Sequence, residues 1–416
     1  MVLLLLTFVF FLVFPVLSIS LSVIGLVNDK KRSKIYLLLI SFAISIVALR
    51  YIPHPMDDGA FHFRATTALI RYDSIFEMFK AFSNGWRVGN YDYGSIPIFT
   101  SLMYLVRNTH HYSLLSFISA FITYFSFGYV VVELFKDLGK VSKLSYATVL
   151  IAVLCLNNYR YTTSGMRFCM AVALMMLLLY LESKKGYTSL KTTIWYLLPV
   201  GIHSAVIYFI GLRFLFPLIK KVTLAKSLFV LLGFPVLFNL VPWLANLIGW
   251  TYLQSFIRKI EVYSDNSSYS QFFNTTLTMR LYVGIVLMVL FVLLYLGIVN
   301  SLKTTDDWRF SFVTMTYYVT LLSMGSIPFR NIYDRNLFLL LPMIVVSTYI
   351  LFTYRHQLKI LTNRNIVYGL TMGILCLSCA VGAFYNNNFP FAFIDFSKTD
   401  LLLKNIFQFF SNLPFT

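Results

Sequence analysis

The chain has 416 residues, of which 58% are hydrophobic and only 12% are charged, and its mean hydropathy is +0.75. Soluble domains carry about 25% charged residues, so this composition excludes a large soluble domain and indicates a polytopic membrane protein. The net charge of +18 does not indicate a nucleic-acid partner, because the basic residues are scattered between apolar runs and form no single patch.

The first apolar run, residues 1–27, is predicted to be a transmembrane helix. It has no basic segment before it and is too long for the apolar part of a signal peptide. The basic cluster KKRSK at 30–34 places the next turn in the cytoplasm by the positive-inside rule. We therefore expect the N-terminus outside, and we expect residues 35–51 to cross back out.

Residues 52–111 are predicted to form a large external loop with short interfacial helices, because they are rich in polar and aromatic residues. The apolar stretch 96–106 would rise only about 16 Å as a helix, half of a bilayer. The next span, 112–135, is followed by lysines that belong in the cytoplasm. The stretch 96–106 must therefore dip into the membrane and return, or lie on its surface, and we expect the re-entrant form.

The segment 190–219 is too long for one crossing, yet the lysines at 220, 221 and 226 require the chain to return to the cytoplasm. Before it, residues 144–158 are expected to exit and 166–182 to re-enter. Two short half-helices that meet near His203 would satisfy both conditions.

The rest of the chain completes a prediction of about twelve transmembrane helices, within a range of 11 to 14, in a single transmembrane domain over 1–416. The count depends on the segments 92–111 and 190–219. We expect an external loop at 251–279 and an external C-terminal tail at 386–416. The remaining predicted spans are 227–250, 280–300, 310–327, 336–353 and 365–385.

Lysine and arginine separate on this topology. The predicted cytoplasmic loops hold 14 lysines and 4 arginines, whereas all other segments hold 12 arginines and 4 lysines. The positive-inside rule does not distinguish the two residues, but arginine is better suited to a bidentate grip on phosphate or carboxylate. The external face is therefore predicted to bind an anionic ligand.

Four external arginines are the candidate anion-binding residues. Arg160 and Arg167 are seven residues apart, a spacing that one helix would place on one face, two turns apart. Arg330 and Arg335 flank an external corner. The alternatives are snorkelling of Arg160 and Arg167 to lipid headgroups, and an ion pair between Arg330 and Asp334.

The candidate acid–base residues are Asp57, Asp58 and His203. The aspartates follow a predicted span directly, and the alternative is a solvated loop start. A neutral imidazole at His203 could accept a proton, and the alternative is a packing histidine that bonds freed backbone. Arg213 lies in an apolar run and should face protein or water.

Several established chemistries lack their sequence signals. The chain has no Walker motif, G-x-G-x-x-G, H-E-x-x-H or G-x-S-x-G. The cysteines Cys376 and Cys379 form a C-x-x-C without a second pair or a nearby histidine, so they are interpreted as buried thiols. We therefore expect no metal and no cofactor.

With these residues identified, the chain resembles the EpsG branch of the Wzy-type bacterial polysaccharide polymerases. The resemblance rests on the external Asp57 loop, on the helix GMRFCMAVALMMLLLYLESKKG, and on the hairpin centre GIHSAVIYF. The family commonly has R-Q-x-x-A in the helix, whereas here the sequence from Arg167 to Ala171 is RFCMA, which lacks the glutamine. The corner near Arg330 and Arg335 also resembles the family's late external corner.

The resemblance implies a GT-C-like membrane glycosyltransferase in the bacterial inner membrane, with its active site facing the exterior or periplasm. The expected substrate is an undecaprenyl-pyrophosphate-linked oligosaccharide, and a chain-length regulator and a flippase are expected partners. The growing glycan would pass onto a new lipid-linked repeat unit. Its pyrophosphate leaving group can be stabilised by arginines without a metal, and a base near the acceptor hydroxyl would help.

Two other functions fit the composition. A flippase or transporter of the same lipid-linked sugar would also have about twelve spans and a cationic cavity, but it would be expected to contain repeats and a midplane site, and neither is visible. An O-antigen ligase shares the donor and the chemistry, so the sequence does not separate it from a polymerase.

Overall fold

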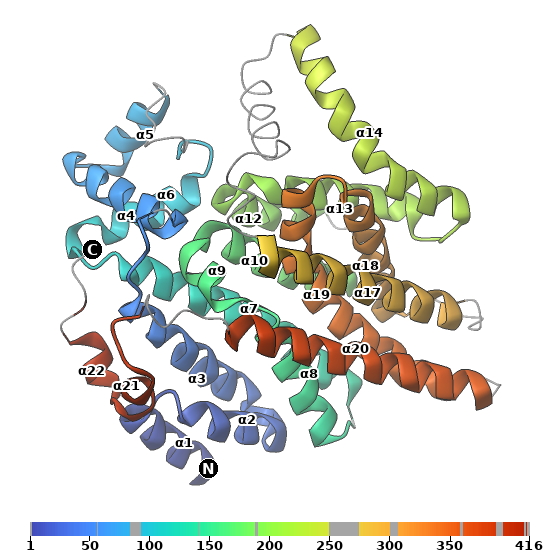
Figure 1. The fold of residues 1–416 in the computed structure, drawn as a ribbon, viewed down its shortest axis with the longest axis horizontal. Coiled ribbons are helices and arrows are strands. Elements are labelled where there is room, and N and C mark those ends of the chain that lie inside the picture. The colour runs from blue at the N-terminus through green and yellow to red at the C-terminus, as the bar shows by residue number, and fades with distance from the viewer. Residues whose placement is uncertain are drawn as a thin grey trace. The chain divides into compact units, whose positions relative to one another are not determined.

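The computed structural model describes residues 2–55, 57–83, 93–139, 141–187, 190–248, 274–299, 307–357, 361–387, 394–411 and 413. These residues form helices, and the one β-bridge among them joins Tyr51 and Ile394 (Figure 1). The described chain is therefore all-α, as predicted. It divides into two compact units.

The first unit contains Met1–Tyr180, Leu190–Tyr208 and Gly382–Thr416, and the second contains Leu181–Ser189 and Phe209–Val381. The helices of the first unit are α1 Val2–Val13, α2 Ser18–Asn28, α3 Ser33–Ile46, α4 Asp58–Ala68, α5 Ile75–Ser83, α6 Pro97–Val106, α7 Ser113–Leu138, α8 Lys143–Cys155, α9 Tyr159–Ser164, most of α10 Met166–Ser183, α11 Leu190–Thr193, α12 Leu197–Ile202, α21 Lys398–Leu403 and α22 Ile406–Phe410.

The helices of the second unit are most of α13 Ile207–Ile219, α14 Leu224–Ile248, α17 Asn274–Val299, α18 Trp308–Gly325, α19 Arg330–Thr353 and most of α20 Leu361–Asn387. Short 3-10 turns extend or join helices at η1 Lys30–Arg32, η2 Val47–Arg50, η3 Leu69–Arg71, η4 Arg107–Thr109, η5 Ile194–Tyr196, η6 Ser204–Val206 and η7 Tyr354–Gln357.

Six helical segments among the described residues are long and apolar enough to cross a membrane. They are Lys30–Arg50, Ser113–Leu138, Met166–Ser183, Leu281–Val299, Ile332–Thr353 and Arg364–Phe384. Five further apolar helices have 10 to 17 residues. The count of about twelve spans and the GT-C-like arrangement therefore stay predictions, and so does the single transmembrane domain.

The predicted first span, 1–27, is two helices rather than one. Pro15 interrupts it between α1 and α2, because proline has no amide hydrogen and clashes with the preceding turn. The Ser18 hydroxyl donates to the Pro15 carbonyl oxygen at 2.6 Å. Each half is 11 or 12 residues long, about 18 Å, which is shorter than the hydrocarbon layer of about 30 Å.

Close helix contacts in the first unit depend on glycine. A Cβ on Gly25 of α2 would lie 2.2 Å from the Tyr36 ring of α3, and one on Gly128 of α7 would lie 2.3 Å from Leu37 of α3. Helices that lack side chains at such points approach closely, which is typical of membrane helices. The pairs α2–α3 and α3–α7 form the framework of this unit.

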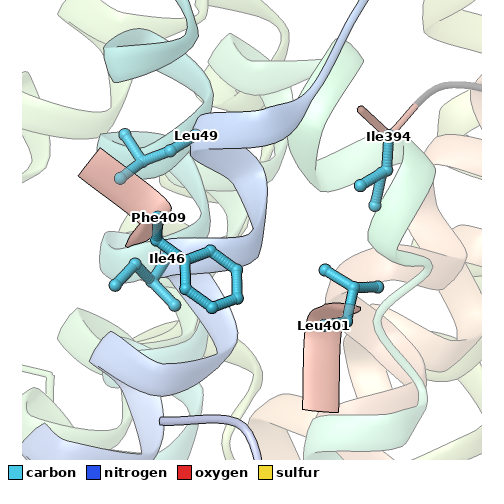
Figure 2. Close-up of a cluster of buried hydrophobic side chains, with 5 residues drawn as sticks. All are labelled: Ile46, Leu49, Ile394, Leu401 and Phe409. Atoms are coloured by element: carbon cyan, nitrogen blue, oxygen red, sulfur yellow. The ribbon is translucent and has the colours of Figure 1, made fainter. Parts of the chain in front are cut away.

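The predicted external tail, 386–416, folds back onto the first unit. Its helices α21 and α22 lie beside α1 and the end of α3 (Figure 1). Ile394, Leu401 and Phe409 are buried in one cluster with Ile46 and Leu49 (Figure 2). The tail is therefore a packed element of the fold in the part that the structure describes.

The second unit is a bundle in which α18 contacts α14, α17 and α19. Tyr295 of α17 stacks on Tyr317 of α18 with ring centroids 4.4 Å apart, and Thr316 and Ser347 join α18 to α19 at 2.7 Å. The predicted loop 251–279 falls on residues 251–273, which lie outside the described part, and on the start of α17.

Candidate functional site

A carboxylate and a guanidinium predicted from the sequence form an ion pair in the first unit. Asp57 immediately precedes α4, and its Oδ1 lies 3.0 Å from Nη2 of Arg160 on α9. The hydroxyl of Tyr51 donates to Asp57 Oδ2 at 3.3 Å. The Asp57 side chain is 13% exposed and that of Arg160 is 36% exposed, so the pair is partly shielded but open to a ligand.

Local interactions fix α4 against α9. The amide of Gly59 donates to Ser164 Oγ at 3.2 Å. A Cβ at Gly59 would lie 3.0 Å from the Tyr51 ring, so glycine allows the close approach. On the other side of α9, the hydroxyls of Ser116 and Ser119 on α7 donate to its carbonyl groups at 2.9 and 2.7 Å. The long helix α7 thereby sets the position of Arg160.

Arg160 and Arg167 lie on two successive helices, although their spacing of seven residues would suit one face of a continuous helix. Helix α9 ends at Ser164, Gly165 takes a non-helical conformation (φ −78°, ψ 37°), and α10 begins at Met166. A Cβ at Gly165 would lie 3.0 Å from the Tyr161 carbonyl oxygen. The glycine permits a break that gives the two arginines separate helices and separate neighbours.

Arg167, at the start of α10, lies above a buried tyrosine. Its Cζ is 5.9 Å from the centre of the Tyr93 ring, and the Tyr93 hydroxyl is 2.9 Å from Nδ1 of His62, which is also buried. Burial raises the pKa of Tyr93, and its hydroxyl also feels the opposing charges of Arg167 and Asp58. Arg167, Asp58, Tyr93 and His62 therefore belong to one neighbourhood.

His62 is held neutral in this neighbourhood. Burial lowers its pKa well below the usual 6.5, and the positive charge of Arg167 lowers it further. The Phe99 ring lies edge-on to His62 at 5.1 Å between centroids. A neutral imidazole can orient the Tyr93 hydroxyl without adding charge beside Arg167.

His203 occupies the predicted break between half-helices. Its backbone is extended (φ −152°, ψ 117°) between α12 and η6, which confirms the break. Its Nδ1 accepts a hydrogen bond from the Ala205 amide at 3.1 Å. When Nδ1 is the acceptor, a neutral ring carries its proton on Nε2, so this geometry favours a hydrogen-bond donor over a base.

His203 also contacts the arginine helix. Its ring lies 5.4 Å from that of Phe168, the residue after Arg167, at an interplanar angle of 74°. The half-helix before it packs on α6, where a Cβ on Gly201 would lie 2.7 Å from Ile98. The two short segments that were predicted not to cross the membrane thus pack on each other, although the re-entrant path of α6 stays a prediction.

The other predicted arginines fall elsewhere. Arg330 begins α19 and Arg335 follows in its second turn, and both belong to the second unit. Their convergence with Arg160 and Arg167 stays a prediction. Arg213 is buried and donates from Nε to Glu182 at 3.0 Å, which confirms that it faces protein and gives it a structural partner.

Three residues of the site were missed from the sequence: Tyr51, His62 and Tyr93. His62 lies four residues after Asp58, a helical spacing that places both on one face and could have identified it. Tyr51 and Tyr93 have no such local signal, because their partners lie in other segments.

The arrangement combines groups suited to acting on an anionic substrate. Arg160 and Arg167 supply positive charge, Asp57 and Asp58 supply carboxylates, and His203 supplies a donor. Guanidinium groups bind phosphate oxygens in a bidentate manner, and a carboxylate can accept a proton from a hydroxyl. This chemistry suits transfer from a phosphorylated donor to an alcohol.

Comparison with known proteins places this region within a family. No curated protein and no solved structure matches the chain. The profile of the EpsG family matches residues 59–395, which is more than half of the chain and begins two residues after Asp57. The chain therefore belongs to the EpsG family, which gives it a membrane polysaccharide polymerase-type function.

Proposed function

We propose that the protein extends a polysaccharide by transferring the growing glycan from its polyprenyl pyrophosphate carrier to a new lipid-linked repeat unit. The carrier is undecaprenyl pyrophosphate, and the reaction takes place at the external face of a bacterial inner membrane. The observation that carries this proposal is the Asp57–Arg160 pair. It sets a candidate base against a candidate phosphate ligand, beside Arg167 and Asp58, in a chain of the EpsG family.

The reaction forms one bond and breaks one. The acceptor hydroxyl oxygen attacks the anomeric carbon of the growing glycan, and the bond from that carbon to the pyrophosphate oxygen breaks. The pyrophosphate leaves with the bonding electron pair, and the hydroxyl proton passes to a carboxylate. Arginines stabilise the charge that develops on the leaving oxygen, and a well-placed base contributes about 10²- to 10⁴-fold to the rate.

Asp57 becomes the base through exchange of partners. In the structure its two carboxylate oxygens are bound to Arg160 and Tyr51. A donor pyrophosphate offers Arg160 a more highly charged partner and releases one carboxylate oxygen. Donor binding thereby prepares the base, which limits proton transfer before both substrates are in place. Asp58, the next residue in the chain, orients the acceptor hydroxyl.

The remaining residues complete the pyrophosphate site. Arg167, supported by the Tyr93 ring, binds the second phosphate, and His203 donates from Nε2 to a phosphate oxygen. Arg330 and Arg335, at the start of α19, are the other two proposed pyrophosphate ligands. A chain-length regulator and a flippase are the proposed protein partners.

The test compares Arg160→Lys with Arg71→Lys in cells that lack the native gene. Lysine keeps the charge but offers only a point contact, so loss of a bidentate grip reduces turnover by about tenfold or more. Arg71 is exposed and contacts the Tyr72 ring at 4.9 Å outside the site, which makes it a matched control. Polymer length on a gel and membrane protein level are measured together.

The expected result is short chains or single repeat units for Arg160→Lys and full-length polymer for Arg71→Lys, at equal protein levels. Full-length polymer from Arg160→Lys would contradict the pyrophosphate role. Loss of surface-exposed single repeat units would instead indicate a transporter. Normal polymer that stays unattached to its terminal acceptor would indicate a ligase.

A further inference from the structure

A second feature of the first unit is a cavity of about 390 Å³ whose lining includes no residue of the candidate site. Its walls come from the end of α2, the turn η1, the end of α7 and the start of α8. Candidate spans begin at Lys30 and end at Leu138 beside it. The cavity therefore lies where these spans meet the membrane surface.

The rim of the cavity is basic. Lys30, Lys31 and Lys143 line it, and all three side chains are exposed. The Lys143 ammonium donates to Asn28 at 2.6 Å and that of Lys30 donates to the Gly139 carbonyl. Both lysines bond neutral oxygens, so their charges are not cancelled by these contacts.

The single carboxylate among the lining residues is already neutralised. Asp29 pairs with Arg32 through oxygen and nitrogen atoms 3.1 Å apart, and it also accepts the Arg32 backbone amide. Lys31 forms no hydrogen bond or ion pair with the residues that the structure describes. The cavity therefore presents net positive charge to a ligand.

The floor of the cavity is apolar and rigid. Phe135 of α7 and Tyr146 of α8 stack with ring centroids 4.2 Å apart and an interplanar angle of 9°, and both are buried. An inorganic anion needs only the rim. A molecule with a charged head and an apolar body would contact both the rim and the floor.

We propose that this cavity binds the phosphate headgroup of an anionic membrane lipid, with the glycerol and upper acyl region against the stacked rings. Basic pockets between membrane helices recognise such headgroups, and each lysine near an anionic surface contributes roughly fivefold in affinity. The lysines would then bind lipid as well as orient the chain in the membrane.

The experiment measures lipid retention by the full-length purified protein. Dioleoyl phosphatidylglycerol or dioleoyl phosphatidylcholine is added in detergent, and bound lipid is counted by native mass spectrometry. The pocket variant replaces Lys30, Lys31 and Lys143 with glutamine. A matched control replaces Lys220, Lys221 and Lys226, which lie between the end of α13 and the first turn of α14. This control variant removes the same charge.

The wild type and the control are expected to prefer phosphatidylglycerol by about tenfold or more, and the pocket variant is expected to lose most of this preference. An unchanged preference in the pocket variant overturns the proposal, and so does an equal loss in the control. Inorganic phosphate that displaces phosphatidylglycerol at equal concentration would overturn the lipid assignment. If the triple variant fails to fold, the single variant Lys31→Gln replaces it, because it breaks no hydrogen bond or ion pair among the described residues. Lys31→Gln is expected to lose a smaller part of the preference for phosphatidylglycerol.

Discussion

At the residue scale, the site shows how far charge pattern alone can predict chemistry. Asp57 and Arg160 were both predicted because charges are costly in an apolar chain, and the structure joins them at 3.0 Å. Their pairing was not predictable, since 103 positions separate them and no local periodicity connects them. The ion pair couples the two roles, because Arg160 occupies a carboxylate oxygen of Asp57 and Asp57 occupies the guanidinium of Arg160.

His203 gives a prediction that separates donor from base. Glutamine can accept the Ala205 amide and still donate, so His203→Gln is expected to retain most of the activity, within about threefold. Phenylalanine offers neither bond, and His203→Phe is expected to lose at least about tenfold, because a charge-assisted hydrogen bond contributes about 1.5–3 kcal/mol. Polymer length is measured at matched protein level.

If His203 were a base, His203→Gln would lose activity. Glutamine cannot take up a proton, so single unpolymerised repeat units from His203→Gln at normal protein level would contradict the donor assignment. A mutant that fails to accumulate in the membrane would support the packing role of the Nδ1 contact instead.

His62 gives a pH prediction. Its pKa is lowered well below 6.5 in the folded protein, so the unfolded chain binds a proton that the folded chain does not. Stability is therefore expected to fall as the pH drops below about 6.5, with a slope of up to about 1.4 kcal/mol per pH unit from this group. Unfolding temperature is measured in detergent between pH 7.5 and 5.5.

The control for this prediction is His62→Gln, which can still bond the Tyr93 hydroxyl but does not titrate. Its unfolding temperature is expected to change less with pH than that of the wild type. Parallel pH profiles for the two proteins would show that another group produces the slope.

At the element scale, helix breaks decided which predictions were correct. The break at His203 was predicted because residues 190–219 are too many for one crossing and the lysines that follow must lie in the cytoplasm. The break at Pro15 was passed over, although proline is a direct signal, because hydropathy averages through a single residue. Packing of α6 on α12 and of the tail on α3 depends on distant contacts that no local pattern contains.

The C-terminal tail is predicted to stabilise the corner that carries Asp57. Arg50, whose side chain is 5% exposed, binds Asp395 at 2.6 Å and the Ser411 carbonyl at 2.9 Å. The next residue, Tyr51, pairs with Ile394 through its backbone and donates to Asp57. The tail therefore fixes the tyrosine that orients the carboxylate.

Asp395→Asn is expected to lower stability by about 1–2 kcal/mol, less than a fully buried pair would lose, because Asp395 is 46% exposed. Activity is expected to fall more than stability alone explains. Unfolding temperature and polymer yield at a temperature well below the transition are compared. Asp400→Asn, an exposed variant in the same tail, serves as control. Equal losses of polymer yield in the two variants would contradict the proposal that the tail acts through Tyr51.

At the scale of the whole molecule, composition predicted a polytopic membrane protein, and the length of each helix decides whether it can cross the membrane alone. Within the described ranges, six segments are long enough to cross, whereas α1, α2, α6 and the halves around His203 are too short alone. Orientation depends on loop charges rather than on the fold.

Topology is tested by labelling single cysteines from each side after replacement of the four native cysteines. Residues 183–191 and 219–226 are expected to be labelled only from the cytoplasm, because their lysines follow the positive-inside rule. Both termini are expected to be labelled from outside. Cytoplasmic labelling at position 265 would contradict the topology from loop 251–279 onward.

The central claim is that the chain itself elongates lipid-linked glycan, and reconstitution tests it most directly. Purified protein in liposomes is supplied only with undecaprenyl-pyrophosphate-linked repeat units, and products are resolved by length. The wild type is expected to give a ladder of polymers with release of undecaprenyl pyrophosphate, and Asp57→Asn is expected to give neither. Repeat units that move across the membrane without lengthening would contradict it.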